Sequence, residues 1–262
     1  MNTSTFRISF QDLNYRRVLS LVRLMNFSQQ AAGLDCAEID MDHYNLNKRG
    51  VTWILLADSI RLTGELPGEY GHLKIETWSS GTRGARFTRE TVFYGKNNTA
   101  EEWREIARGS SEWALIEMAD VTPLKPDSVA DTEQIDGWSR NVIGLIERVP
   151  KLRQPEGDKV RLNAVPVFVS DLDSNRHVHN ANYVRMGIDR LAEMLGLDAR
   201  DTDLVIREFC IRFIAETKLG ETLEWFAVET GEGEVWLEAR EQMTDEVKVR
   251  LTLNYTIEPG HI

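Results

Sequence analysis

The chain repeats part of itself, and this recurrence limits its fold more than any other feature. The segment IRLTGELPGEYGHLKIETW begins at Ile60 and resembles IRFIAETKLGETLEWFAVET, which begins at Ile211, about 150 residues later. Similarity at such a distance indicates that a whole folding unit is duplicated. A length of 262 residues also suits one large or two modest domains. We therefore predict two similar domains paired about a pseudo-twofold axis.

The first half combines a helical pattern with segments of strand length. Apolar residues three and four positions apart predict an amphipathic helix over residues 13–34, ending near Gly33. Turn-type sequences, GELPGEYG, SSGTRG and GKNNTAEE, then separate four predicted antiparallel strands. These strands are Val51–Leu62, Gly71–Trp78, Ala85–Tyr94 and Ile106–Ile116.

The second half repeats this order after a weakly patterned segment. Residues 119–158 contain four prolines and predict a linker with one short helix at Gly137–Arg148. A strand is expected at Lys159–Ser170 and a helix at Asn180–Leu195. The strands predicted after this helix are Leu204–Glu216, Glu221–Thr230, Glu234–Gln242 and Val247–Ile257.

The fold expected from these patterns is α+β. A long helix on one face of a strongly curved antiparallel sheet describes the hotdog fold. We predict two tandem hotdog domains forming a pseudo-dimer, at residues 1–130 and 159–262, with a linker at residues 131–158. Two such units must join their sheets or cover their edges, because open edges invite aggregation. A generic two-layer α+β protein is the alternative.

Composition disfavours several classes of function. A net charge of −11 makes nucleic acid a poor partner. Cys36 and Cys210 are the two cysteines, too few for a disulfide scaffold or a structural zinc site. The first residues lack a secretory signal pattern, and the longest apolar run, near Val51–Ala57, is far below the roughly 20 residues of a membrane span. We expect a soluble, cytoplasmic protein.

The run VSDLDSNRHVHN, between a predicted strand and a predicted helix, is the strongest candidate site. Asp173, Asn175 and His177 are spaced two residues apart, so an extended backbone would project all three to one side. A carboxylate, an amide and an imidazole can polarise a carbonyl and steer water. The alternative is ordinary turn and capping residues. A metal site at His177 and His179 is disfavoured, because no cysteine or further histidine cluster lies near them in the sequence. No metal or cofactor is expected.

This run resembles the signature Asp-Leu-Asp-x-Asn-x-His-Val-Asn-Asn of the acyl-ACP thioesterases, the plastid enzymes of plants and their bacterial relatives. Residues 171–180 match it except at His179, which replaces the first Asn of the closing pair. The following Asn182-Tyr183-Val184 also matches. In the first half, NKRGVTWILLADSIRL and KIETWSSGTRGARFTRE extend the resemblance over nearly the whole chain. The resemblance implies a tandem hotdog without a cofactor.

The resemblance also implies a fourth site residue. Plant members carry a Glu on a strand in a Tyr-Arg-Arg-Glu-Cys pattern, which residues 213–217 match as Phe-Ile-Ala-Glu-Thr. The implied catalytic set is therefore Asp173, Asn175, His177 and Glu216. Thr217 stands where the plant enzymes have Cys, so a cysteine nucleophile does not carry over, and Cys210 is expected to be a small core residue.

Thioester hydrolysis suits these groups, because a thiol with a pKa of about 8.5 leaves without strong acid help. Glu216 or Asp173 would act as base toward water, and which of them does so stays open. Asn175 and His177 would position water and substrate, while backbone N–H groups at the start of the Asn180 helix would polarise the carbonyl.

The first half is expected to have no chemistry of its own, since FQDLNYRR enters its helix without a histidine. We expect the first hotdog to supply the acyl tunnel, from the apolar faces of Leu21–Phe27 and Trp53–Leu56. Plain core packing is the alternative for these residues.

The expected function is hydrolysis of long- or medium-chain acyl-ACP, releasing free fatty acid in fatty acid biosynthesis. An acyl-CoA thioesterase, a hotdog dehydratase and a catalytically silent acyl-binding module are the alternatives. The expected partner is an acyl carrier protein with a phosphopantetheine-linked acyl chain, and the chain could also form a homodimer. Carrier proteins are acidic, so docking requires local cations, for which the candidates are Lys48, Arg49, Arg83, Arg86 and Arg89.

Overall fold

The computed structural model describes residues 2–97, 102–125, 128 and 152–260. Its contacts divide the chain into two compact units, Met1–Arg148 and Val149–Ile262. In the described part of the chain, none of the helices is both long and apolar enough to cross a membrane. The short helix expected at Gly137–Arg148 lies outside the described residues.

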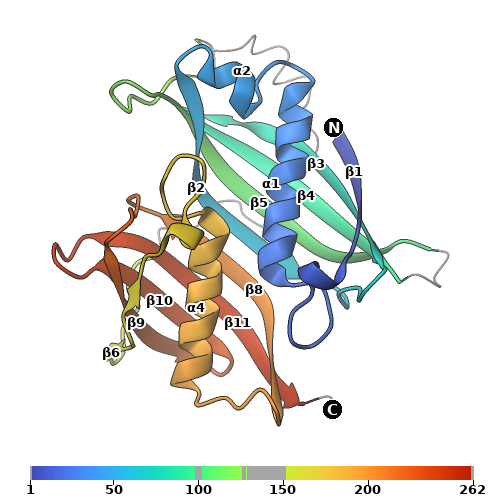
Figure 1. The fold of residues 1–262 in the computed structure, drawn as a ribbon, viewed down its shortest axis with the longest axis vertical. Coiled ribbons are helices and arrows are strands. Elements are labelled where there is room, and N and C mark those ends of the chain that lie inside the picture. The colour runs from blue at the N-terminus through green and yellow to red at the C-terminus, as the bar shows by residue number, and fades with distance from the viewer. Residues whose placement is uncertain (1, 98–101, 126–127, 129–151, 261–262) are drawn as a thin grey trace. The chain divides into compact units, whose positions relative to one another are not determined.

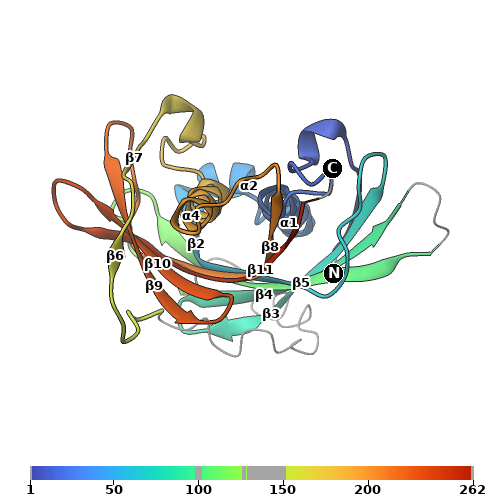
Figure 2. The ribbon, with the colours of Figure 1, turned by 90° about the horizontal axis from the view of Figure 1, so that it is seen from below.

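The first unit is a five-stranded antiparallel sheet with a long helix on one face (Figure 1). Its strand order is β1-β3-β4-β5-β2, and Figure 2 shows α1 lying along one side of this curved sheet. The elements are β1 (Asn2–Arg7), the 3-10 turn η1 (Phe10–Asp12), α1 (Leu21–Ala37), α2 (His43–Asn47), β2 (Val51–Leu62), β3 (His72–Arg83), β4 (Arg86–Lys96) and β5 (Arg104–Glu117). The four strands predicted for this half are therefore present.

The helix α1 begins later than its sequence pattern predicts. Residues 13–20 form a tight turn, because the Asn14 side-chain oxygen accepts hydrogen bonds from the N–H groups of Arg16 (2.9 Å) and Val18 (3.4 Å). Such side-chain bonds to nearby backbone compete with helix formation. The prediction of a helix over residues 13–34 is thus wrong at both ends, since α1 runs from Leu21 to Ala37.

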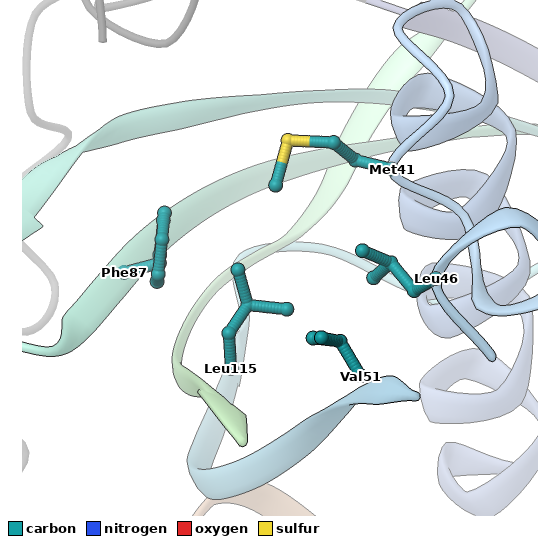
Figure 3. Close-up of a cluster of buried hydrophobic side chains, with 5 residues drawn as sticks. All are labelled: Met41, Leu46, Val51, Phe87 and Leu115. Atoms are coloured by element: carbon teal, nitrogen blue, oxygen red, sulfur yellow. The ribbon is translucent and has the colours of Figure 1, made fainter. Parts of the chain in front are cut away.

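The first unit has an apolar core at one end of its sheet. Five buried side chains from the segment after α1, from α2 and from three strands point toward one another in Figure 3: Met41, Leu46, Val51, Phe87 and Leu115. Trp53 packs its ring edge-on against Phe87, at 4.9 Å between centroids. Burial of this apolar surface fastens α2 to β2, β4 and β5.

A buried ion pair ties α1 to β4. Arg89 Nη1 lies 2.7 Å from Asp35 Oδ2, and Arg89 Nη1 also lies 3.2 Å from Thr77 Oγ1. Both charged side chains are buried, so removing either one would leave an uncompensated charge at a cost of about 3–5 kcal/mol. Arg89 therefore cannot serve as a docking cation, and that sequence expectation is wrong.

The second unit has the same architecture. Its strand order is β8-β11-β10-β9-β6, all antiparallel, with β7 paired to β9. The elements are β6 (Val160–Arg161), β7 (Val165–Pro166), the 3-10 turn η3 (Val169–Asp171), α4 (Asn180–Met194), β8 (Thr202–Phe213), β9 (Thr222–Gly231), β10 (Glu234–Glu241) and β11 (Val247–Pro259). The helix and the last four strands agree with the prediction.

A glycine lets α4 lie close on this sheet. A Cβ atom at Gly187 would come within 2.3 Å of Leu251 Cδ2 on β11. Leu251, Leu237 and Trp225 below the helix are fully buried. Each unit is thus a long helix packed on an antiparallel sheet, and the chain is a tandem hotdog.

The strand expected at Lys159–Ser170 is wrong. Two strands of two residues, β6 and β7, occupy the segment, followed by η3. Pro166 has no N–H to donate to a longer ladder. Before this segment, the carbonyl of Leu152 accepts a hydrogen bond from Trp236 Nε1 (3.0 Å), so the end of the expected linker packs within the second unit.

Candidate active site

The chain enters α4 through a turn that Asp171 holds in place. The Asp171 carboxylate accepts a bond from the Phe168 N–H (3.0 Å) at Oδ2 and from Arg185 Nη2 (2.8 Å) at Oδ1. Its carbonyl accepts bonds from the His179 N–H (2.8 Å) and from Asn182 Nδ2 (3.0 Å). One buried aspartate therefore connects η3, the turn and the first turn of α4.

Asp173, Asn175 and His177 lie on a tight turn and not along an extended strand. The backbones of Asp173 and His177 face each other, with 2.8 Å from the Asp173 N to the His177 O. Arg176 closes the turn with a φ of 66°, a conformation that residues other than glycine adopt rarely. The expectation of an extended run is therefore wrong. The residue types at these positions do not indicate that Arg176 adopts a left-handed conformation.

The Asp173 carboxylate is used within this turn. Its Oδ1 accepts the N–H groups of Asn175 (2.8 Å) and His177 (3.3 Å). Asn175 lies at the tip and is exposed. The structure thus gives Asp173 a part in shaping the turn and leaves the Asn175 side chain at the surface.

Glu216 approaches His177 from the loop after β8. The resemblance implied a strand position, but β8 ends at Phe213 and Glu216 lies three residues beyond it. The loop is fastened to the turn by a backbone bridge between His177 and Lys218 and by a bond from the Val178 N–H to the Thr217 carbonyl (2.9 Å). As a result, His177 Nε2 lies 3.0 Å from Glu216 Oε2.

Two lysines surround Glu216. Lys218 Nζ lies 2.6 Å from Glu216 Oε1, and Lys248 Nζ donates to the Glu216 carbonyl at 2.9 Å. The hydrogen bond from Lys218 is the main reason that the pKa of Glu216 lies below its usual value, with the charges of His177, Lys218 and Lys248 adding to it. Glu216 is therefore a carboxylate at neutral pH.

His179 caps α4. Its Nδ1 accepts the N–H of Ala181 at 3.3 Å, and burial lowers the pKa of the imidazole. The ring is therefore neutral at neutral pH, with Nδ1 as acceptor. Burial also raises the pKa of Tyr183, one turn into the helix, to about 12. Among the described residues, no group of three or more His, Cys, Asp or Glu side chains could hold a metal ion.

The first unit contains the same turn without the acid and imidazole pair. Asp12 accepts the Ser9 N–H (2.9 Å) and contacts Arg23, as Asp171 does with Phe168 and Arg185. Asn14 replaces Asp173, and Arg17 has a φ of 61°. A backbone bridge joins Val18 to Gly68, where the second unit joins His177 to Lys218. The contacts shared by the two units build the turn, and the His177–Glu216 pair is present in the second unit's turn and not in the first.

Sequence reasoning missed Lys218 and Lys248. Neither belongs to the motif of the turn, and Lys248 comes from β11, 32 residues beyond Glu216. Lys218 had a signal, because it follows Glu216 by two residues, the spacing that puts side chains on one side of an extended backbone. Lys248 had no such signal, since β11 meets this loop only in the folded unit.

Comparisons with known proteins find similarity to acyl-ACP thioesterases. The model of the acyl-ACP thioesterase C-terminal domain matches residues 156–257, which include the turn and Glu216. The chain is 26% identical over 192 residues to FATB2, a chloroplastic acyl-[acyl-carrier-protein] hydrolase of Cuphea viscosissima. This match covers 68% of the chain and 44% of that relative, so the chain spans less than half of the relative's length.

Solved structures show the same fold over nearly the whole chain. An acyl-ACP thioesterase from Bacteroides thetaiotaomicron superposes with a TM-score of 0.80 at 21% identity, covering 97% of each chain. A 12:0-ACP thioesterase from Umbellularia californica gives a TM-score of 0.74 at 17% identity, covering 98% of this chain and 97% of that one. At these identities the likeness concerns the fold.

Proposed function

We propose, from the similarity of residues 156–257 to the acyl-ACP thioesterase C-terminal domain, that the chain is an acyl-ACP thioesterase and hydrolyses the thioester of long- or medium-chain acyl-ACP. The reaction releases free fatty acid and belongs to fatty acid biosynthesis. The observation that carries the proposal is the His177–Glu216 pair, 3.0 Å apart, in the segment that the family model matches. The proposed catalytic residues are Asp173, Asn175, His177 and Glu216.

His177 is the proposed base, in place of Glu216 or Asp173, which the sequence suggested. Both carboxylates are already engaged, Asp173 by two backbone N–H groups and Glu216 by Lys218 and His177. A neutral imidazole that donates from Nε2 to Glu216 has its Nδ1 free to accept a proton from water. Glu216 then stabilises the imidazolium that forms, as the acidic member of a triad does.

The reaction balances with these groups. The oxygen of water bonds to the thioester carbon while His177 takes one proton, and the carbonyl becomes an oxyanion. The N–H at the start of α4, at Asn180, and the Asn175 amide are the proposed oxyanion donors. Collapse of the oxyanion breaks the C–S bond, and the departing thiolate recovers the proton from His177.

A thiol-release assay tests this function. Purified chain is incubated with acyl-ACP substrates of several acyl lengths, and the free thiol is measured colorimetrically. His177→Ala should lower kcat/KM by at least about 100-fold and Glu216→Gln by at least about tenfold, the range for loss of acid-base groups. Val18→Ala, at the corresponding place in the first unit, is the matched control and should keep full activity.

Three outcomes of this assay would overturn the proposal in whole or in part. Equal turnover of the same acyl chain on ACP and on CoA would remove the carrier-specific claim and leave a general acyl thioesterase. If wild type releases thiol and both site variants release it at the same rate, the proposed site is wrong. If wild type releases no thiol, the chain is a silent acyl-binding module.

The first unit is the proposed home of the acyl chain and of the carrier contact. Leu21–Phe27 and Trp53–Leu56 supply buried apolar side chains to it, which supports an acyl tunnel there. Of the remaining docking cations, Lys48 lies over the Tyr44 ring and Arg49 donates to the Asp40 carbonyl. Arg83 and Arg86, exposed at the β3–β4 turn, are the proposed contacts for an acidic carrier, and Arg86 also lies 3.4 Å from Glu112.

A further inference from the structure

We propose that Lys218 is a positioning residue of this site, which holds the Glu216 carboxylate against the imidazole of His177. The proposal rests on the proposed function, because it assigns Lys218 a part in the same reaction. Lys218 itself is not a catalytic residue, since it acts on the substrate only through Glu216.

The two oxygens of Glu216 have different partners. Oε1 lies 2.6 Å from Lys218 Nζ, and Oε2 lies 3.0 Å from His177 Nε2. A carboxylate rotates freely about its last torsion when one oxygen alone is bound. The second contact fixes that rotation, so the oxygen that faces His177 stays in place.

The backbone places the two partners side by side. His177 and Lys218 are opposite each other in an antiparallel bridge, and directly opposed residues of such a pair project their side chains to the same face. Glu216, two residues before Lys218, lies between them on that face. The ammonium and the imidazole therefore reach one carboxylate from two backbone segments.

The first unit shows that the turn does not need a lysine there. Gly68 forms the same bridge with Val18, so a residue without a side chain supports this backbone. Lys218 is more than half exposed, and an exposed ion pair contributes little to folding. Its side chain is thus free to serve the site.

Several charged or titratable side chains surround Glu216. The groups around Glu216 are His177 on the turn, Lys218 and Glu221 on the β8–β9 loop, Glu246 on the β10–β11 loop and Lys248 on β11. The two glutamates pair with Lys248, at 3.4 and 2.7 Å, which leaves Lys218 as the main cation on the Glu216 carboxylate.

Lys218 affects the pH at which Glu216 takes up its proton. Lys218 lowers the pKa of Glu216, so the carboxylate persists to a lower pH than it would alone. Without the ammonium, Glu216 takes up its proton at a higher pH. The acid limb of the pH profile of kcat/KM should therefore move to higher pH when Lys218 is replaced by a neutral residue.

The experiment compares wild type, Lys218→Met and Lys218→Arg in the full chain. Lys218→Met should lower kcat/KM for an acyl thioester at pH 7 by about two- to fivefold, as for an exposed ion pair, and shift the acid limb upward. Lys218→Arg should restore both. Lys74→Met is the matched control, because Lys74 also pairs with a glutamate two residues away, Glu76 at 3.0 Å, in the first unit.

A second readout does not depend on activity. The Cδ resonance of Glu216, assigned with Glu216→Gln in protein labelled at glutamate Cδ, reports its titration directly by NMR. It should titrate at higher pH in Lys218→Met and as in wild type in Lys218→Arg and Lys74→Met. An unchanged titration in Lys218→Met overturns the role of Lys218, whereas a shifted titration in a chain that hydrolyses no thioester overturns only the proposed function.

Discussion

At the residue scale, the first unit shows which property of Asp173 is needed to form the turn. Asn14 makes the corresponding two bonds with an amide oxygen, to Arg16 and Val18, and its turn is formed without a carboxylate. The backbone bonds of Asp173 therefore require an acceptor oxygen and not a negative charge.

We predict that Asp173→Asn keeps kcat/KM within about tenfold of wild type, whereas Asp173→Ala loses about 100-fold because the turn opens. The loss of a general base costs at least about 100-fold, so a loss of that size in Asp173→Asn would make Asp173 the base. Steady-state thiol release measures both variants, and Asn14→Ala, with the same bonds in the first unit, controls for damage to folding alone.

The residues of the site could be predicted from sequence, but their arrangement could not. The motif and the resemblance singled out His177 and Glu216, which the structure places 3.0 Å apart. The left-handed Arg176 and the position of Glu216 beyond β8 were not readable, because neither has a characteristic residue type. Lys248 reaches this loop from β11, a contact that depends on tertiary packing.

At the element scale, each long helix is fastened at its start by one buried aspartate. Asp12 joins η1 to α1 through Arg23 (2.6 Å), and Asp171 joins η3 to α4 through Arg185 (2.8 Å). Each also accepts the backbone N–H before its 3-10 turn, from Ser9 and from Phe168. The two aspartates are thus a matched pair in different units.

We predict that Asp12→Ala and Asp171→Ala each lower the free energy of unfolding by about 2–3 kcal/mol, because each removes the hydrogen bonds made to a buried carboxylate. Urea unfolding followed by circular dichroism measures this. Only Asp171→Ala should also lower kcat/KM under conditions where both variants are folded, because only its turn carries His177. Equal activity of the two folded variants would show that the turn does not position the site.

Strands whose ends are marked by turn-forming residues were predicted well. Strands next to loops that fold back were predicted less well. The strand Val51–Leu62 has the predicted bounds, since glycine and charged residues flank it. The segment Lys159–Ser170 has enough β-branched residues to indicate a strand, but Pro166 and the capping contacts of Asp171 divide it. For α1, the apolar spacing continued through a turn that Asn14 maintains.

At the scale of the whole molecule, the two units share one architecture, and the His177–Glu216 pair lies in the second unit. The first unit has Val18 and Gly68 where the second has His177 and Lys218, so it is expected to bind and not to react. Its buried charge pair, Asp35 and Arg89, also removes one cation from the surface that a carrier protein would meet.

The net charge of −11 then determines how an acidic carrier approaches the chain. Two acidic proteins repel each other over a screening length of about 10 Å at 0.1 M salt, so added salt should raise the encounter rate.

We predict that kcat/KM for acyl-ACP rises about two- to tenfold between about 20 and 200 mM NaCl, within the range by which long-range charge changes association rates. The double variant Arg83→Glu/Arg86→Glu should be slower at low salt, and its rate should rise more steeply with salt, because local attraction at the β3–β4 turn becomes repulsion. Arg153→Glu/Arg200→Glu replaces two exposed cations of the second unit and is the control, because it changes the net charge by the same amount. A fall of kcat/KM with salt in wild type would mean that a local cationic patch outweighs the overall charge, and an identical salt response in the control and the double variant would place the carrier elsewhere than Arg83 and Arg86.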